Sequence, residues 1–144
     1  MKKIMMIAAA AVLAFTAMSC KNAPKYELTD GEWMLISWND EGGEEMMVTA
    51  NRPTMKFDAD MKVHGFAGCN QFNGTYEATN EVIRINMGAM TMKMCMDMTT
   101  ENQMVMLMPN VVEFEIEGNQ LILYNKDRKE LFRFDNTVEP ANNQ

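Results

Sequence analysis

Apolar and polar residues alternate along most of the chain after position 30, which is the pattern of β-strands with one buried face. The first of these stretches covers residues 32–39. There Trp33 and Leu35 point to one face, while the apolar residues between and after them point to the other. A strand that is apolar on both faces indicates a central place in a sheet.

Further strands are predicted wherever the alternation resumes between turn residues. Their ranges are 46–49, 53–58, 62–66, 75–77, 81–86, 112–116, 121–124 and 131–134. Gly118 and Asn119 are a two-residue hairpin signal. The pattern predicts about seven or eight strands, since the shortest ranges are weak signals.

One short helix is predicted before Pro109. Thr100 and Gln103 have the spacing of a capping box at its start. Apolar residues follow at helical spacing: Met104, Leu107 and Met108. Because strands and helices do not alternate, a doubly wound fold is excluded. We expect a mainly β fold with one α-helix: a compact antiparallel sheet curled into a small, partly open barrel with one short covering helix.

The stretch 63–76 interrupts this regularity with glycines, asparagines and the single histidine of the chain, His64. The glycines are Gly65, Gly68 and Gly74. Glycine permits a positive φ or a close approach of two backbones, and asparagine tolerates the left-handed region. We therefore expect a tight connection between two strands here.

Residues 1–19 have the features of a signal peptide, because Lys2 and Lys3 precede a short apolar segment. The sequence A-M-S-C that ends at Cys20 resembles the lipobox of bacterial lipoproteins, whose cysteine is acylated and becomes the mature N-terminus. Cys20 is thus the predicted lipidation site, and its acyl chains would hold the protein at a membrane. The alternatives are an ordinary secretory signal cut near Ser19 and an uncleaved anchor.

The remaining chain has the length of a single domain. Residues 20–30 are polar and predict a tether, residues 31–135 the domain, and residues 136–144 a frayed C-terminus. The formal net charge is −7, and removal of the signal peptide would make the chain more acidic. This charge argues against nucleic acid and against an anionic membrane surface as partners, so lipid and not basic residues would anchor the protein.

Two cysteines, Cys69 and Cys95, remain if Cys20 is acylated. Disulfides persist in exported proteins, and a bridge between these two would contribute about 3 kcal/mol of stability. Two buried free thiols and a metal-binding pair are the alternatives.

Catalytic residues are scarce. His64 has no identifiable partner in the sequence, and Asp58 and Asp60 flank a turn, where aspartates usually cap the backbone. Cys69 with His64 could form a thiol–base pair, but oxidation of Cys69 would abolish it. We therefore expect no enzymatic activity and no cofactor.

Methionine occupies every second position in one segment: Met90, Met92, Met94, Met96 and Met98. In an extended chain these side chains share a face. The row has three interpretations: one buried face of the core, the lining of an apolar cavity that holds a lipid or a hydrophobic peptide, or a soft-metal site. The Cu(I) ligands of that last alternative would be Met90, Met92, Met94, Cys95 and Met96. A methionine-based oxidant sink belongs to the same alternative.

Several motifs together resemble the META domain, the family of HslJ-type heat-inducible bacterial lipoproteins. The two central motifs run from Gly65 to Tyr76 and from Thr91 to Cys95, the second with Lys93 at its middle position. Their residues are Gly65, Gly68, Cys69, Asn70, Gly74, Tyr76, Thr91 and Cys95. Trp33, Phe57-Asp58 and Glu101 add to the match, which spans residues 27–134. The resemblance implies a small β-rich fold with one helix, a link to stress or antibiotic tolerance at the cell envelope, and no established catalytic activity.

We therefore expect a monomeric, lipid-anchored protein of the bacterial envelope, on the outer membrane and facing the periplasm. It would bind an envelope protein or a hydrophobic ligand. Soft-metal binding and methionine-based oxidant protection are the alternative functions.

Overall fold

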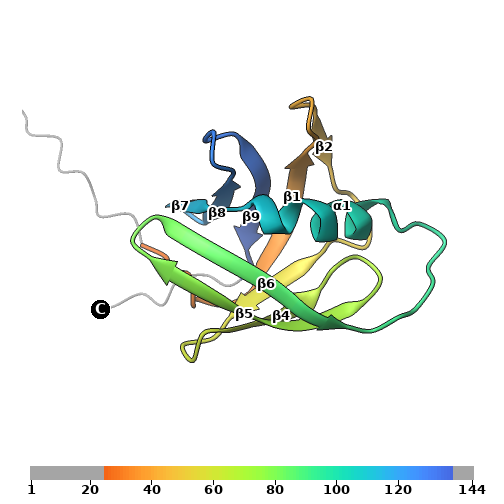
Figure 1. Ribbon diagram of the computed structural model, residues 1–144, viewed down its shortest axis with the longest axis horizontal. Helices are drawn as coiled ribbons and strands as arrows, with labels where there is room; N and C mark the ends of the chain where they lie inside the picture. Colours follow the sequence, from red (N-terminus) through yellow and green to blue (C-terminus); the bar gives the residue numbers. More distant parts are fainter. Residues whose placement is uncertain (1–24, 138–144) are drawn as a thin grey trace, which may run out of the picture.

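The computed structural model describes residues 25–137, which form one antiparallel sheet of nine strands and one α-helix (Figure 1). The strands are β1 (Trp33–Asn39), β2 (Glu45–Met47), β3 (Thr54–Phe57), β4 (Lys62–Phe66), β5 (Gln71–Thr79), β6 (Val82–Met90), β7 (Glu113–Glu117), β8 (Gln120–Tyr124) and β9 (Glu130–Asn136). Helix α1 (Thr99–Leu107) and the 3-10 helix η1 (Met108–Asn110) lie between β6 and β7. The expected mainly β fold with one short helix is confirmed.

Strand β1 joins the two ends of the sheet. The order is β2-β1-β3-β4-β5-β6-β7-β8-β9, and β1 also pairs with β9, so the sheet is ring-like. Trp33 and Leu35 of β1 are fully buried, as their alternation predicted. A register shift between Leu35 and Ser37 then brings Ser37 and Trp38 into buried positions as well. The central place expected for this strand is confirmed.

Large side chains fill the interior of the ring. The largest fully buried ones are Trp33, Phe57, Phe72, Phe132 and Phe134. Burying each such ring stabilises the fold by roughly 1.5–3 kcal/mol relative to leaving it in water. Ile83 and Ile85 are buried while Val82 is exposed, as expected for a strand with one buried face.

The glycine-rich segment is a β-hairpin and not one long connection. Strand β4 continues to Phe66 and β5 begins at Gln71, so only residues 67–70 form the turn. Gly65 and Gly74 lie within the strands, and glycine is required there because a Cβ would overlap the carbonyl oxygens of Thr54 and Asn86 on the adjacent strands. The tight turn is confirmed, but β5 is longer than the predicted range 75–77.

Strand β6 also extends beyond its predicted end at residue 86. Gly88 has a φ of +63°, and a register shift in the β5–β6 pairing lies opposite it. This irregularity lets the strand continue to Met90, four residues beyond the predicted range.

Helix α1 packs on the core through Met104 and Leu107, as its spacing predicted. The predicted capping box of Thr100 and Gln103 is wrong, because the helix begins at Thr99 and has no side-chain cap. Instead the backbone N–H of Thr99 donates to the carboxylate of Asp97 at 2.9 Å, which lowers the pKa of Asp97.

Both ends of the described chain pack against β1. Tyr26, within the predicted tether, is buried and makes an edge-on contact with Trp33, with ring centroids 6.3 Å apart. The N–H of Thr137 donates to the carbonyl oxygen of Glu32. The predicted signal peptide, the lipidation site Cys20 and residues 138–144 lie outside the described residues. No helix in the described range is long and apolar enough to cross a bilayer.

Replacing Gly74 with alanine should lower the free energy of unfolding by roughly 3 kcal/mol, because the new methyl group overlaps backbone atoms of β6 that cannot move independently. Denaturant unfolding measures the loss. Gly118→Ala is the matched control: its site is open, so only the positive φ of +59° opposes the change, at a cost of about 1 kcal/mol. Equal losses in the two variants would contradict the close packing of β5 against β6.

Candidate functional site

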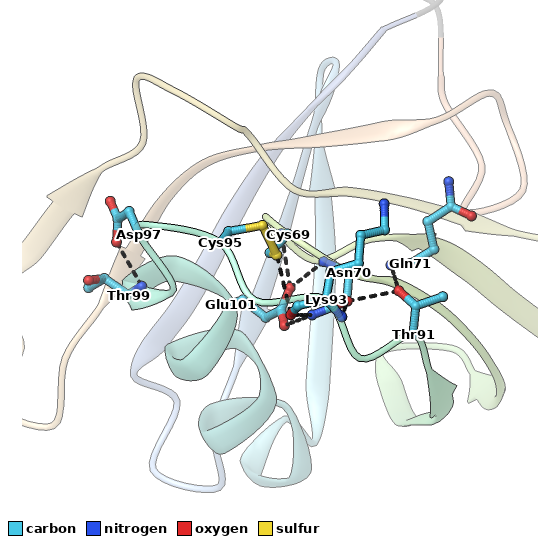
Figure 2. The surroundings of a disulfide bond; sticks show 9 residues. All are labelled: Cys69, Asn70, Gln71, Thr91, Lys93, Cys95, Asp97, Thr99 and Glu101. Carbon is cyan, nitrogen blue, oxygen red and sulfur yellow. Dashed lines mark hydrogen bonds between the residues drawn. A yellow bond between two sulfur atoms is a disulfide. The ribbon is translucent and has the colours of Figure 1, made fainter.

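A buried carboxylate links helix α1 to the β4–β5 turn. Glu101, in the first turn of α1, is 5% exposed. Its Oε2 accepts the backbone N–H of Cys69 at 2.9 Å and that of Asn70 at 2.6 Å. Its Oε1 accepts the side-chain N–H of Asn70 at 2.7 Å (Figure 2). These three bonds replace the water that the charged group gives up on burial.

The side chain of Asn70 extends this network to the chain that follows β6. It is 3% exposed, and its Oδ1 accepts the Thr91 hydroxyl at 2.9 Å and the backbone N–H of Lys93 at 2.6 Å. Its Nδ2 also donates to the carbonyl oxygen of Lys93 at 3.1 Å. Asn70 therefore holds residues 91–93 against the turn, as Figure 2 shows.

A disulfide between Cys69 and Cys95 fixes the same segment a second time. The two Cα atoms are 6.0 Å apart, and the bond joins positions 26 residues apart in sequence. The predicted bridge is confirmed, and the alternatives of two free thiols or a metal-binding pair are wrong. The closed loop reduces the entropy of the unfolded chain, which corresponds to about 3 kcal/mol of stability.

The middle of the methionine row faces solvent, whereas Met90 is partly buried against the core. Met92, Met94 and Met96 are 95%, 91% and 109% exposed, so the prediction of a buried face is wrong. The residues between these methionines are bonded to the turn, Thr91 and Cys95 through their side chains and Lys93 through its backbone. The methionines lie on the loop between β6 and α1, which projects at the right of Figure 1, and the middle three of them meet water.

These side chains continue onto helix α1 as one apolar surface. We call it the methionine surface. It consists of the groove-lining residues Met90, Met92, Met94, Met98, Val105 and Met106, together with the exposed Met96 of the same loop. A groove of about 360 Å³ runs between the loop and the helix, with Asn70 and Glu101 among its lining residues. The sequence pattern revealed the methionines but not Val105 and Met106, which face outward from a helix whose opposite side is buried.

The soft-metal alternative required a thiolate ligand from Cys95. That thiolate does not exist, because the sulfur of Cys95 is bonded to that of Cys69. Methionine sulfurs that converged on one ion would also shield one another from water. Met92, Met94 and Met96 are almost completely exposed, so they do not converge. Within residues 25–137 there is also no group of three or more His, Cys, Asp or Glu residues placed to hold a metal ion.

His64 has a partner that the sequence analysis missed. Its Nδ1 lies 3.2 Å from the carboxylate of Asp58, and both side chains are about two-fifths exposed. The β3–β4 pairing, which places Phe57 opposite Val63, brings the two residues together and could have been inferred from the two adjacent strand patterns. Cys69 offers no thiol for a thiol–base pair with His64, because it is oxidised.

The predicted motif residues fall into two groups. Gly68, Cys69, Asn70, Thr91 and Cys95 meet beside the methionine surface, together with Glu101. Gly65, Gly74 and Tyr76 belong to the sheet instead. Tyr76 packs edge-on against Phe57 and donates its hydroxyl to the Asp58 carbonyl oxygen, and burial raises its pKa.

A second, larger groove of about 500 Å³ lies where the β1–β2 turn, η1 and the β8–β9 turn meet. Charged residues of both signs, including Asp40, Lys126 and Glu130, line it beside apolar ones such as Leu131. No sequence signal pointed to this groove.

Comparison with known proteins gives a family and a fold. The META domain matches residues 26–138. A protein from Burkholderia xenovorans, solved by NMR, is 19% identical with a TM-score of 0.64, and the match covers 78% of this chain and 85% of that one. A DUF4847 family protein from Bacteroides vulgatus, solved by crystallography, is 15% identical with a TM-score of 0.55, and the match covers 78% of this chain and 96% of that one. At these identities the likeness is one of fold. No curated protein matches the chain.

Replacing Glu101 with glutamine should lower the free energy of unfolding by about 2 kcal/mol, because an amide N–H would then face N–H groups that now donate to a carboxylate. Denaturant unfolding measures the change, with the exposed Glu81→Gln as the control that alters the same charge. If both variants unfold at the wild-type denaturant concentration, Glu101 does not hold the turn.

Proposed function

We infer that this chain, which belongs to the META domain family, is a non-enzymatic, lipid-anchored protein of the bacterial envelope that binds an apolar segment of another envelope protein through its methionine surface. The observation that carries this proposal is the exposure of Met92, Met94 and Met96 on a loop that a disulfide and a buried hydrogen-bond network hold in place.

Exposed apolar side chains gathered on one surface are typical of interaction sites. Methionine suits such a site, because its unbranched and polarisable side chain adapts to the shape of a partner. The backbone beneath these side chains is already ordered by the bonds of Asn70 and Cys95, so binding would cost little further backbone entropy.

The packing of the interior supports a partner on the outside. Aromatic rings such as those of Phe72 and Phe132 occupy the inside of the ring-like sheet. A lipid enclosed by the strands would have to displace them. The acidic net charge of −7 supports a protein partner over an anionic membrane surface.

The chemistry of the described residues supports a binding role over catalysis. Cys69 is held in a disulfide, and His64 is paired with Asp58 beside a turn of the sheet. The resemblance to HslJ-type lipoproteins supports a role in stress or antibiotic tolerance, with the domain on the outer membrane and facing the periplasm.

Replacing Cys20 with alanine should move the protein from the membrane fraction to the soluble periplasmic fraction, because no acyl chain could then be attached. Fractionation of cells that produce each form measures the distribution. The exposed Cys95 offers a matched control: Cys95→Ala also removes a cysteine and should leave the protein on the membrane. Membrane retention of the Cys20→Ala variant would contradict the lipid anchor.

A photo-reactive amino acid placed at Met94 should form a covalent adduct with one discrete envelope protein on irradiation of intact cells. The same amino acid at Met47 is the control, because Met47 is 62% exposed on β2 and lies outside the methionine surface. Adduct from position 94 but not from position 47 is the expected result on denaturing gels. Equal adduct from both positions, or none from position 94, would contradict binding through the methionine surface.

A further inference from the structure

We propose that Met92, Met94 and Met96 are a reversible oxidation site through which peroxide switches the methionine surface from a binding to a non-binding state. The switching part rests on the proposed function, whereas the oxidation site itself can be tested without any partner.

These three methionines are far more exposed to solvent than the methionines of the core. Their side chains are between 91% and 109% exposed, whereas Met55, Met104 and Met108 are at most 1% exposed. An oxidant in solution can reach a thioether only where the sulfur meets water, and oxidation therefore follows exposure. The three loop methionines should react first.

The cysteines of the described chain do not compete for the oxidant. Cys69 and Cys95 are already joined, so residues 25–137 contain no free thiol. Within residues 25–137, the thioethers of the loop are thus the most accessible sulfurs that remain to be oxidised.

The chemistry is a two-electron transfer of one oxygen atom. The sulfur attacks an oxygen of hydrogen peroxide, the S–O bond forms as the O–O bond breaks, and water leaves. Methionine sulfoxide is the product, with the sulfur oxidised and the peroxide oxygen reduced. A methionine sulfoxide reductase reverses the step, since its dithiol becomes a disulfide and the oxygen leaves as water.

The loop can accept this change without unfolding. It is held by the bonds of Asn70 to Thr91 and Lys93 and by the disulfide at Cys95, and none of these involves a methionine side chain. Sulfoxidation would therefore leave the backbone in place and make the surface polar. The groove between the loop and Val105 would lose the apolar side that faces a partner.

Peptide-resolved mass spectrometry of the full mature protein, sampled over time in hydrogen peroxide, tests the oxidation site. Met92, Met94 and Met96 should gain oxygen at least about tenfold faster than Met55, Met104 and Met108, because exposure governs the rate. Comparable rates for the two groups would overturn the proposal.

Photo-cross-linking from Val105 tests the switch, because this position lies beside the groove and leaves all three methionines intact. Envelope membranes are irradiated untreated, after peroxide, and after peroxide followed by methionine sulfoxide reductases. The adduct yield should fall severalfold with peroxide and return with the reductases, because oxidation follows exposure and is reversible.

A chain carrying Met92→Leu, Met94→Leu and Met96→Leu controls for oxidation of the partner. Its adduct yield after peroxide is compared with that of its own untreated sample, and peroxide should not reduce it. Selective sulfoxide formation with an undiminished wild-type yield would overturn the switch while leaving the proposed binding intact. Equal loss in the leucine chain would also overturn it. Absence of adduct in the untreated wild type would overturn the proposed binding and the switch together, while the oxidation rates would still be read separately.

Discussion

The buried carboxylate of Glu101 is the interaction on which the candidate site depends. A charged group with almost no contact with water is stable only when hydrogen-bond donors surround it, and here two successive backbone N–H groups and one amide supply them. Gly68 makes this arrangement possible, because its φ of +121° turns the chain so that the N–H groups of residues 69 and 70 point to the same oxygen. The carboxylate in turn fixes Asn70, and the side chain of Asn70 holds the loop of residues 91–98.

The core inside the ring-like sheet stabilises the fold, whereas the loop that follows β6 presents exposed apolar side chains. Aromatic and aliphatic side chains inside the ring supply the hydrophobic stabilisation. The loop of residues 91–98 buries little apolar surface, so it cannot order itself by packing. A covalent bond and a polar network order it instead, and this leaves its methionines available for contacts outside the chain. A surface of this kind can change its chemistry without loss of the fold beneath it.

The places where sequence and structure differ share a cause. Gly65 and Gly74 suggested a turn, but they are strand residues that allow neighbouring backbones to approach. The alternation predicted a strand that ends at residue 86, but Gly88 accommodates an irregularity through which the strand continues. A glycine that is required by a neighbouring strand cannot be distinguished by local pattern from one that is required by its own turn. The failed capping box of Thr100 has a similar origin, since Asp97 satisfies the start of the helix and residue 101 is drawn toward the β4–β5 turn.

Local patterns by themselves determined the class of this protein: the alternation that makes strands, the short helical stripe of Met104 and Leu107, the family motifs, and the single pair of cysteines that remains if Cys20 is acylated. Each of these follows from residues close together in the chain or from residue type alone. The direction of the methionine row is different, because a period of two shows only that side chains share a face. Tertiary structure decided that the middle of the row meets water, since the bonds that hold Thr91, Lys93 and Cys95 against the β4–β5 turn come from residues more than twenty positions away.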